Sequence, residues 1–152
     1  MGVGDLAWVA EPQPARWDED KARIVGDEAE GVFRPQYGRF AVGEIIPGTW
    51  FRVERDGEVV GYGWMDLSWG NAEILVATRK DVRGRGVGSF VLDRLRDEAE
   101  SAGMKYVTNV VRNSHPEKDR VTQWLEKRGF AAGEDGRMFR ALSRPSVPPP
   151  AG

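Results

Sequence analysis

The sequence predicts a single-domain α/β fold in which a mixed, mostly antiparallel sheet is flanked by helices. The chain has 152 residues, which is the size of one compact domain. Its middle alternates short apolar runs with glycine-containing turns, and this pattern predicts an antiparallel meander. After the meander, an amphipathic helical segment stands between two apolar runs. That order predicts a strand–helix–strand unit, and therefore one parallel pair within the sheet.

The first part of the chain is expected to supply an opening strand and a charged helix. Residues 6–10 are short and apolar and precede Pro12 and Pro14, so they predict a strand that runs into a turn. Residues 16–33 are charged and mostly compatible with a helix. Residues 34–48 are rich in glycine and proline and predict a loop.

The meander is expected to begin at Thr49. Residues 50–53 and 59–67 predict two strands, and Asp56-Gly57 between them is a hairpin signal. A second turn at Gly70-Asn71 leads into residues 73–77, a short apolar run suited to a central strand. The six tryptophans of the chain are expected to pack in the core or at its rim.

The second half is expected to alternate helices with strands. From residue 87 to residue 102, apolar or small residues recur at helical spacing, and Gly103 provides a stop. Ser114 and Glu117 stand in capping-box spacing and predict another helix start. The expected elements are a helix over residues 87–102, a strand over 106–111, a helix from 114 to 129, and a strand pair over 130–131 and 137–142.

Composition excludes several kinds of site. The chain has no cysteine, which excludes a disulfide framework, a thiolate metal site and a cysteine nucleophile. The single histidine, His115, rules out a multi-histidine metal site, and its place beside Pro116 favours helix capping. No metal is expected. Because neither a membrane-length apolar run nor a signal peptide is visible, we expect a cytoplasmic protein with no membrane partner. An excess of arginine over lysine, 17 against 5, suggests a bacterial source.

Charge is divided unevenly along the chain. Residues 1–70 carry a net charge of −6 and residues 71–152 a net charge of +4. Either one cationic and one anionic partner meet on the domain, or the surface charge is simply uneven. No basic stripe is interleaved with aromatic residues, so no nucleic acid is expected as a partner.

The most informative segment is Arg-Gly-Arg-Gly-Val-Gly-Ser at residues 83–89, between an apolar strand and an amphipathic helix. Glycines let backbone N–H groups approach a ligand, and two arginines with a helix N-terminus favour an anion such as pyrophosphate. A P-loop is excluded, because Gly88 is followed by Ser89-Phe90 rather than by lysine. A dinucleotide fingerprint lacks its acidic residue about 20 positions later. The pattern Arg/Gln-x-x-Gly-x-Gly/Ala does match, at Arg83, Gly86 and Gly88.

That pattern is typical of the GNAT superfamily of acyl-CoA-dependent N-acyltransferases, which the sequence resembles over about residues 49–142. Residues 72–76, 87–102 and 106–111 resemble the fourth strand, central helix and fifth strand of the family, and residues 124–130 its closing Glu-Lys-x-Gly-Phe element. The resemblance implies splayed fourth and fifth strands that hold acetyl-CoA, and direct transfer of the acetyl group to a primary amine of a small molecule or protein. The alternative is an acyl-CoA-binding or sensor module without catalysis. We expect residues 1–142 to form this domain, residues 143–152 to be a disordered proline-rich tail, and the protein to be a monomer or homodimer.

The resemblance also implies site residues. Glu73 is the candidate base, acting through water, or else a solvated strand-end carboxylate; Asp66 and Glu44 are the alternatives. Leu125 stands where many family members carry a tyrosine acid, and Asn113 resembles the asparagine that follows the fifth strand. Backbone N–H groups of residues 75–77 are expected to stabilise the oxyanion. The residues expected to bind CoA are Leu75, Val76, Ala77, Arg83, Gly84, Arg85, Gly86, Val87, Gly88, Ser89 and Asn113.

Overall fold

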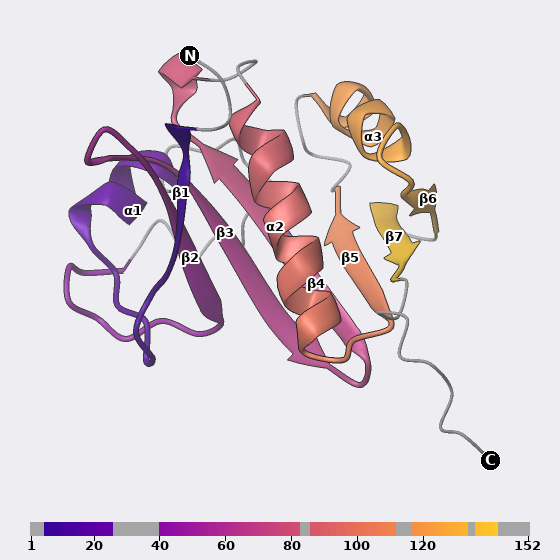
Figure 1. Ribbon diagram of the computed structural model, residues 1–152, viewed down its shortest axis with the longest axis horizontal. Helices are drawn as coiled ribbons and strands as arrows, with labels where there is room; N and C mark the ends of the chain where they lie inside the picture. The colour runs from indigo at the N-terminus through magenta and orange to yellow at the C-terminus, as the bar shows by residue number, and fades with distance from the viewer. Residues whose placement is uncertain (1–4, 26–39, 83–85, 112–116, 134–135, 143–152) are drawn as a thin grey trace.

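A seven-stranded sheet organises the chain (Figure 1). The computed structural model describes residues 5–25, 40–82, 86–111, 117–133 and 136–142. The strand order is β1-β2-β3-β4-β5-β7-β6, and β4 with β5 is the parallel pair in an otherwise antiparallel sheet. The predicted fold class is confirmed.

The elements are β1 (Ala7–Ala10), α1 (Glu19–Ile24), β2 (Thr49–Arg55), β3 (Glu58–Ser68), β4 (Asn71–Thr78), the 3-10 helix η3 (Lys80–Val82), α2 (Val87–Ser101), β5 (Tyr106–Val110), α3 (Lys118–Glu126), β6 (Ala131–Ala132) and β7 (Arg137–Ala141).

Helices α1 and α3 and the 3-10 helix η3 depart most from the sequence-based expectations. Helix α1 has six residues, fewer than the charged stretch 16–33 predicts, and residues 26–33 fall outside the described part. Helix α3 is described from Lys118, so the expected capping residue Ser114 also falls outside it. Helix η3 was not expected, because three residues carry too little periodicity to be recognised.

One face of the sheet is covered by α2, which crosses β3 and β4 (Figure 1). Its apolar side chains pack with alternate residues of the strands, among them Phe51 and Met65, in one core cluster. Gly63 allows this close approach, since a Cβ there would lie 2.9 Å from Trp8 and 3.1 Å from Leu95. Leu125 joins the same cluster, so α3 covers this face as well.

The opposite face carries α1 and a cluster of aromatic side chains. Trp50 and Trp64 are buried there with Ile24 of α1. Both indole N–H groups donate to the carbonyl oxygen of Pro47, at 3.0 and 3.2 Å. Gly48 has φ +88°, and a Cβ at this position would lie 2.0 Å from Nε1 of Trp64. The chain therefore needs glycine where it passes over the aromatic cluster.

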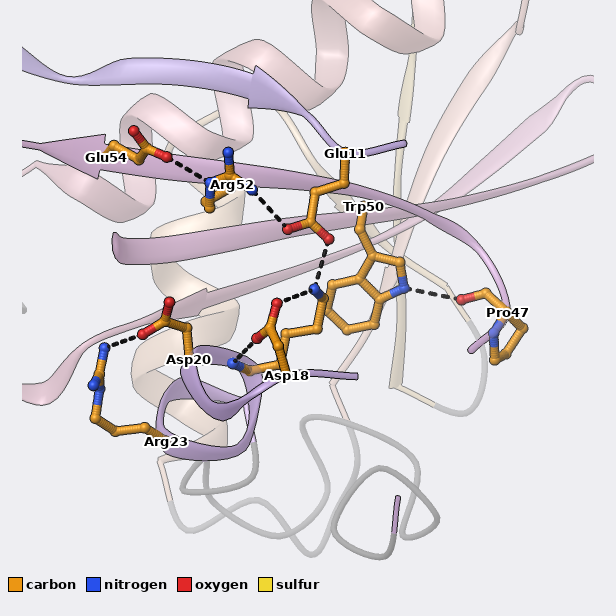
Figure 2. Close-up of polar contacts among 9 residues, drawn as sticks. Glu11, Asp18, Asp20, Arg23, Pro47, Trp50, Arg52 and Glu54 are labelled. Carbon is orange, nitrogen blue, oxygen red and sulfur yellow. Dashed lines mark hydrogen bonds and ion pairs between the residues drawn. The ribbon is translucent and has the colours of Figure 1, made fainter. Parts of the chain in front are cut away.

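A buried lysine fastens α1 to the sheet through Glu11 and Asp18, which Figure 2 labels. Lys21 is 1% exposed, and its Nζ lies 2.6 Å from Oε1 of Glu11 and 2.9 Å from Oδ2 of Asp18. The other oxygen of Glu11 lies 3.2 Å from Nη1 of Arg52 on β2. A buried ammonium needs such partners, because an uncompensated charge in the interior is costly. The network thus ties α1 to the end of β1 and to the middle of β2.

The ring of Tyr62 lies beneath this network. Nζ of Lys21 is 5.1 Å from the centre of that ring. Within the described part of the chain, Oη of Tyr62 is the buried side-chain polar atom that has no hydrogen-bond partner. Burial, with the nearby carboxylates of Asp18 and Glu11, raises the pKa of Tyr62 far above its ordinary value. The hydroxyl is therefore protonated at neutral pH.

Trp69 corrects the expectation that every tryptophan packs. It is fully exposed at the turn between β3 and β4, where Ser68 pairs with Asn71. Trp69 and Gly70 have φ values of +51° and +81°, as a two-residue hairpin turn of this hand requires. A side chain at such a tip has no neighbouring element against which to pack.

The network predicts a large stability loss on replacing Lys21→Met, which leaves the carboxylate of Glu11 buried with Arg52 as its remaining partner. We expect the free energy of unfolding, from urea denaturation, to fall by about 3 kcal/mol. Arg23→Met is the matched control, because Arg23 lies on the same helix in an exposed pair with Asp20. It is expected to cost about 0.5 kcal/mol or less. Equal losses in the two variants would contradict a stabilising role for the buried pair.

Candidate active site

Strands β4 and β5 part after three residue pairs. Asn71, Ala72 and Glu73 pair with Tyr106, Val107 and Thr108, and Glu73 with Thr108 is the last pair. Residues 74–78 of β4 and 109–110 of β5, all described, continue without pairing to each other. We call this segment the β4–β5 parting and its last pair the vertex. The splayed strands that the resemblance implies are therefore present.

Backbone polar groups line both sides of the parting. The carbonyl of Gly70 accepts from the N–H groups of Lys105 and Tyr106, so even-numbered residues of β4 turn their backbone groups toward β5. By this alternation, the N–H and C=O of Val76 face the parting. On the other side, Val111 N–H donates to Gly136 near β7, so the backbone groups of Val110 face β4. Backbone donors and acceptors of β4 and β5 therefore face each other across the parting without pairing.

Two carboxylates lie beside the vertex. Glu73 is the third residue of β4, and Asp66 is its antiparallel partner on β3. Glu73 shares its face with Leu75, which is buried in the cluster under α1, so both acids lie on the face opposite α2. The structure thus brings the candidate base and one of its alternatives together. Glu44, the other alternative, is exposed on the loop before β2, and its backbone carbonyl accepts from Trp17 N–H.

The three predicted β4 residues have different surroundings. Leu75 and Ala77 are buried under α1, whereas Val76 packs partly buried on the α2 side. Their side chains therefore belong to the core. A ligand could therefore reach only their backbone groups. Of the three residues, Val76 is the one that turns its N–H and C=O toward β5.

The N-terminus of α2 lies at the open end of the parting. Gly86 caps the helix with φ +85° and no side-chain cap bond, and Val87 is buried. A Cβ on Gly88 would lie 3.6 Å from Trp124 of α3 and 4.0 Å from Thr78 at the end of β4. The first backbone N–H groups of α2 therefore lie close to the end of β4. Arg83, Gly84 and Arg85 fall outside the described residues.

Arg128 contributes a positive charge at this helix start. Its Nη2 donates to Oγ of Ser89, and its guanidinium carbon lies 4.8 Å from the centre of the Trp124 ring. The charge thus adds to the positive end of the α2 dipole. Sequence reasoning missed this residue although it lies in the recognised closing element. Its partner is 39 positions away, and no local pattern reports such a pair.

The position expected to supply an acid is buried in the core. Leu125 is 1% exposed within the core, so its position offers no proton donor. Asn113 and His115 fall outside the described residues. In the described part of the chain, no group of three or more histidine, cysteine or acidic residues is arranged to hold a metal ion. None of the described helices has the length and apolar character needed to cross a membrane.

Comparison with known proteins gives consistent findings. A profile of the acetyltransferase (GNAT) family matches residues 8–135. An uncharacterized N-acetyltransferase of Methanocaldococcus jannaschii is 37% identical over 54 residues, which are 35% of this chain and 35% of that protein. The chain thus matches about a third of the length of this relative.

Solved structures share the fold. The IAA acetyltransferase from Bacillus cereus superposes with a TM-score of 0.64 at 17% identity, covering 90% of this chain and 99% of that one. The N-acetylglutamate synthase from Neisseria gonorrhoeae, complexed with coenzyme A and N-acetyl-glutamate, gives a TM-score of 0.65 at 18% identity, covering 91% of this chain and 35% of that one. At these identities the likeness shows the fold alone.

The α2 turn predicts opposite effects at two of its glycines. Gly86→Ala forces a side chain into a positive φ and is expected to lower the free energy of unfolding by about 1 kcal/mol. Gly88→Ala adds only an ordinary contact with Trp124 and improves helix propensity. It is expected to be neutral or to stabilise by up to about 1 kcal/mol. Urea denaturation measures both, and a stabilising Gly86→Ala would contradict the left-handed cap.

Proposed function

The chain belongs to the acetyltransferase (GNAT) family, and from that premise we propose that it transfers an acetyl group from acetyl-CoA directly to a primary amine. The acceptor amine belongs to a small molecule or a protein. The observation that carries the proposal is the β4–β5 parting, whose open end lies beside the N-terminus of α2.

The donor fits the parting by its chemistry. CoA carries a pyrophosphate and a flexible pantetheine arm with two amide groups. Those amides suit the carbonyl of Val76 and the backbone groups of Val110, which otherwise face each other across separated strands. The pyrophosphate suits the first N–H groups of α2, from Gly86 to Ser89, with Arg83, Arg85 and Arg128 adding positive charge.

The acceptor fits the acidic face beside the vertex. A primary alkylamine has a pKa of about 10.4, so at neutral pH it arrives as a cation and must lose a proton before it attacks. Asp66 and Glu73, paired across β3 and β4, attract that cation. In the proposal Glu73 takes the proton through a water molecule, because it stands at the vertex where the parting begins.

The transfer step then proceeds without a covalent enzyme intermediate. The amine nitrogen attacks the thioester carbonyl carbon, and the N–H of Val76 donates to the oxyanion that forms. As the C–S bond breaks, the nitrogen loses its second proton to solvent, the amide product keeps the acetyl group, and CoA leaves as a thiolate. Thiols have a pKa near 8.5, so this thiolate takes a proton from solvent without a dedicated acid. That accommodates leucine at position 125, and Asn113 stays a predicted contact of CoA.

Binding of the donor is the first prediction of this proposal. Isothermal titration calorimetry is expected to show binding of acetyl-CoA and of CoA to the wild-type protein. Arg83→Ala and Gly86→Glu are expected to weaken it about tenfold or more, because each removes positive potential or adds a carboxylate where the pyrophosphate binds. Asp66→Asn, on the opposite face, is the control with unchanged affinity. Absence of binding at millimolar concentration would end the proposal.

Catalysis provides a separate prediction. With an acceptor found by screening amines and peptides for thiol release from acetyl-CoA, Glu73→Gln is expected to lower kcat about 10²- to 10⁴-fold, as loss of a general base does. The affinity for CoA should stay nearly unchanged. Asp66→Asn should raise the KM of the amine a few-fold and largely retain kcat. An unchanged rate in Glu73→Gln would exclude Glu73 as the base.

A second candidate function is binding of acyl-CoA without turnover, as in a sensor module. The burial of Leu125, at the position where many family members carry a tyrosine, favours it. The thiol-release screen separates the two candidates. Steady release of CoA with any amine rejects the sensor. Tight binding without release across the whole panel rejects the enzyme.

A further inference from the structure

Asn109 occupies the hydrogen-bonding position at which the β4–β5 ladder would otherwise continue. In a continued parallel ladder, the next β5-facing carbonyl of β4, that of Ile74, accepts from the backbone N–H of Val110. Here Nδ2 of Asn109 donates to that carbonyl at 2.8 Å. A side chain has thus taken the acceptor that the next backbone rung would use, one residue beyond the vertex.

We propose that Asn109 is a positioning residue that keeps β4 and β5 apart when no ligand is bound. The inference rests on the proposed function, because the parting is the proposed site of acyl-CoA. The side-chain amide competes with Val110 N–H for the carbonyl of Ile74, so the strands do not close by another rung. The parting is then preformed, and acyl-CoA binds without first breaking a backbone pair.

Packing alone does not explain why position 109 carries an asparagine. Its neighbours on the same face of β5, Val107 and Val111, are 1% and 3% exposed, and its partner on β7, Met138, is 2% exposed. Asparagine is unfavourable in strands, and an amide in such a row is costly unless it is hydrogen-bonded. A valine at position 109 would have the higher strand propensity and would bury no polar group. The bond to Ile74 is what asparagine supplies and valine does not.

Amide hydrogen exchange of the wild-type protein is the first test of the inference. Backbone N–H groups of Thr108 and Val110 both face β4, but only Thr108 lies within the paired part. In the free protein, NMR should therefore show faster exchange at Val110 than at Thr108. Equal protection of the two amides would overturn the proposal without any variant.

Replacement of the side chain tests it from the other direction. In Asn109→Val, Val110 N–H gains access to the Ile74 carbonyl, so its exchange should slow. The Kd of CoA by calorimetry should rise about 3- to 10-fold, the equivalent of breaking one net hydrogen bond on binding. The KM of the amine should stay unchanged, because the acceptor side is untouched. If Asn109→Val does not fold, as judged by circular dichroism, Asn109→Ala is measured in the same way.

Thr108→Val is the matched control. It also removes one side-chain hydrogen bond between the same strands, that of Thr108 Oγ1 to Asn71 Oδ1 at 2.5 Å, but within the paired part. Val110 exchange and the Kd of CoA should both stay as in the wild type. Folded Asn109 variants with unaltered exchange and Kd would overturn the inference, and an equal change in Thr108→Val would also do so. Failure of the proposed function is distinct, because it appears as absence of CoA binding by the wild type.

Discussion

The loss of backbone pairing between β4 and β5 is the constraint around which the molecule is arranged. Backbone N–H and C=O groups are obligatory hydrogen-bonding groups, and a sheet normally satisfies them strand by strand. Here β4 gives one edge to β3 along its whole length and the other edge to β5 for only three residues. The rest of that edge faces polar groups of β5 at a separation that does not pair them. In the proposed function a ligand with amides of its own completes the pattern, and the site then consists largely of backbone.

In the proposed reaction, one face of the sheet binds the acyl donor and the other face binds the amine acceptor. The α2 face leads to a helix start enriched in positive charge, whereas the α1 face carries Asp66 and Glu73. This division gives the uneven charge of the sequence an interpretation, since the basic half contains the α2 turn and the acidic half most of the α1 face. The buried Lys21 network keeps α1 against the sheet and thereby maintains the second face.

Sequence predicted what local chemistry determines. Turns at Asp56-Gly57 and at Gly70 have the positive φ values that their residues suggest, and the apolar spacing of α2 matches its buried face. Contacts between distant residues escaped, because no local pattern reports them: Lys21 with Glu11, Arg128 with Ser89, and Asn109 with Ile74. In the candidate site, the strand–turn–helix unit and the splayed strands were therefore predictable from the sequence. The hydrogen bonds that Arg128 and Asn109 make within that site were not.

The short parallel pairing also bears on the order in which the chain folds. The strands β2, β3 and β4 are joined by tight hairpins and make contacts that are close in sequence, which form quickly. Asn109 and Ile74 are 35 positions apart, and the connection between them, which includes α2, must fold back onto the sheet before they meet. Loop-closure entropy delays such contacts, so the border of the ligand site assembles after the meander. A nascent chain is therefore expected to form its core sheet before the β4–β5 parting takes shape.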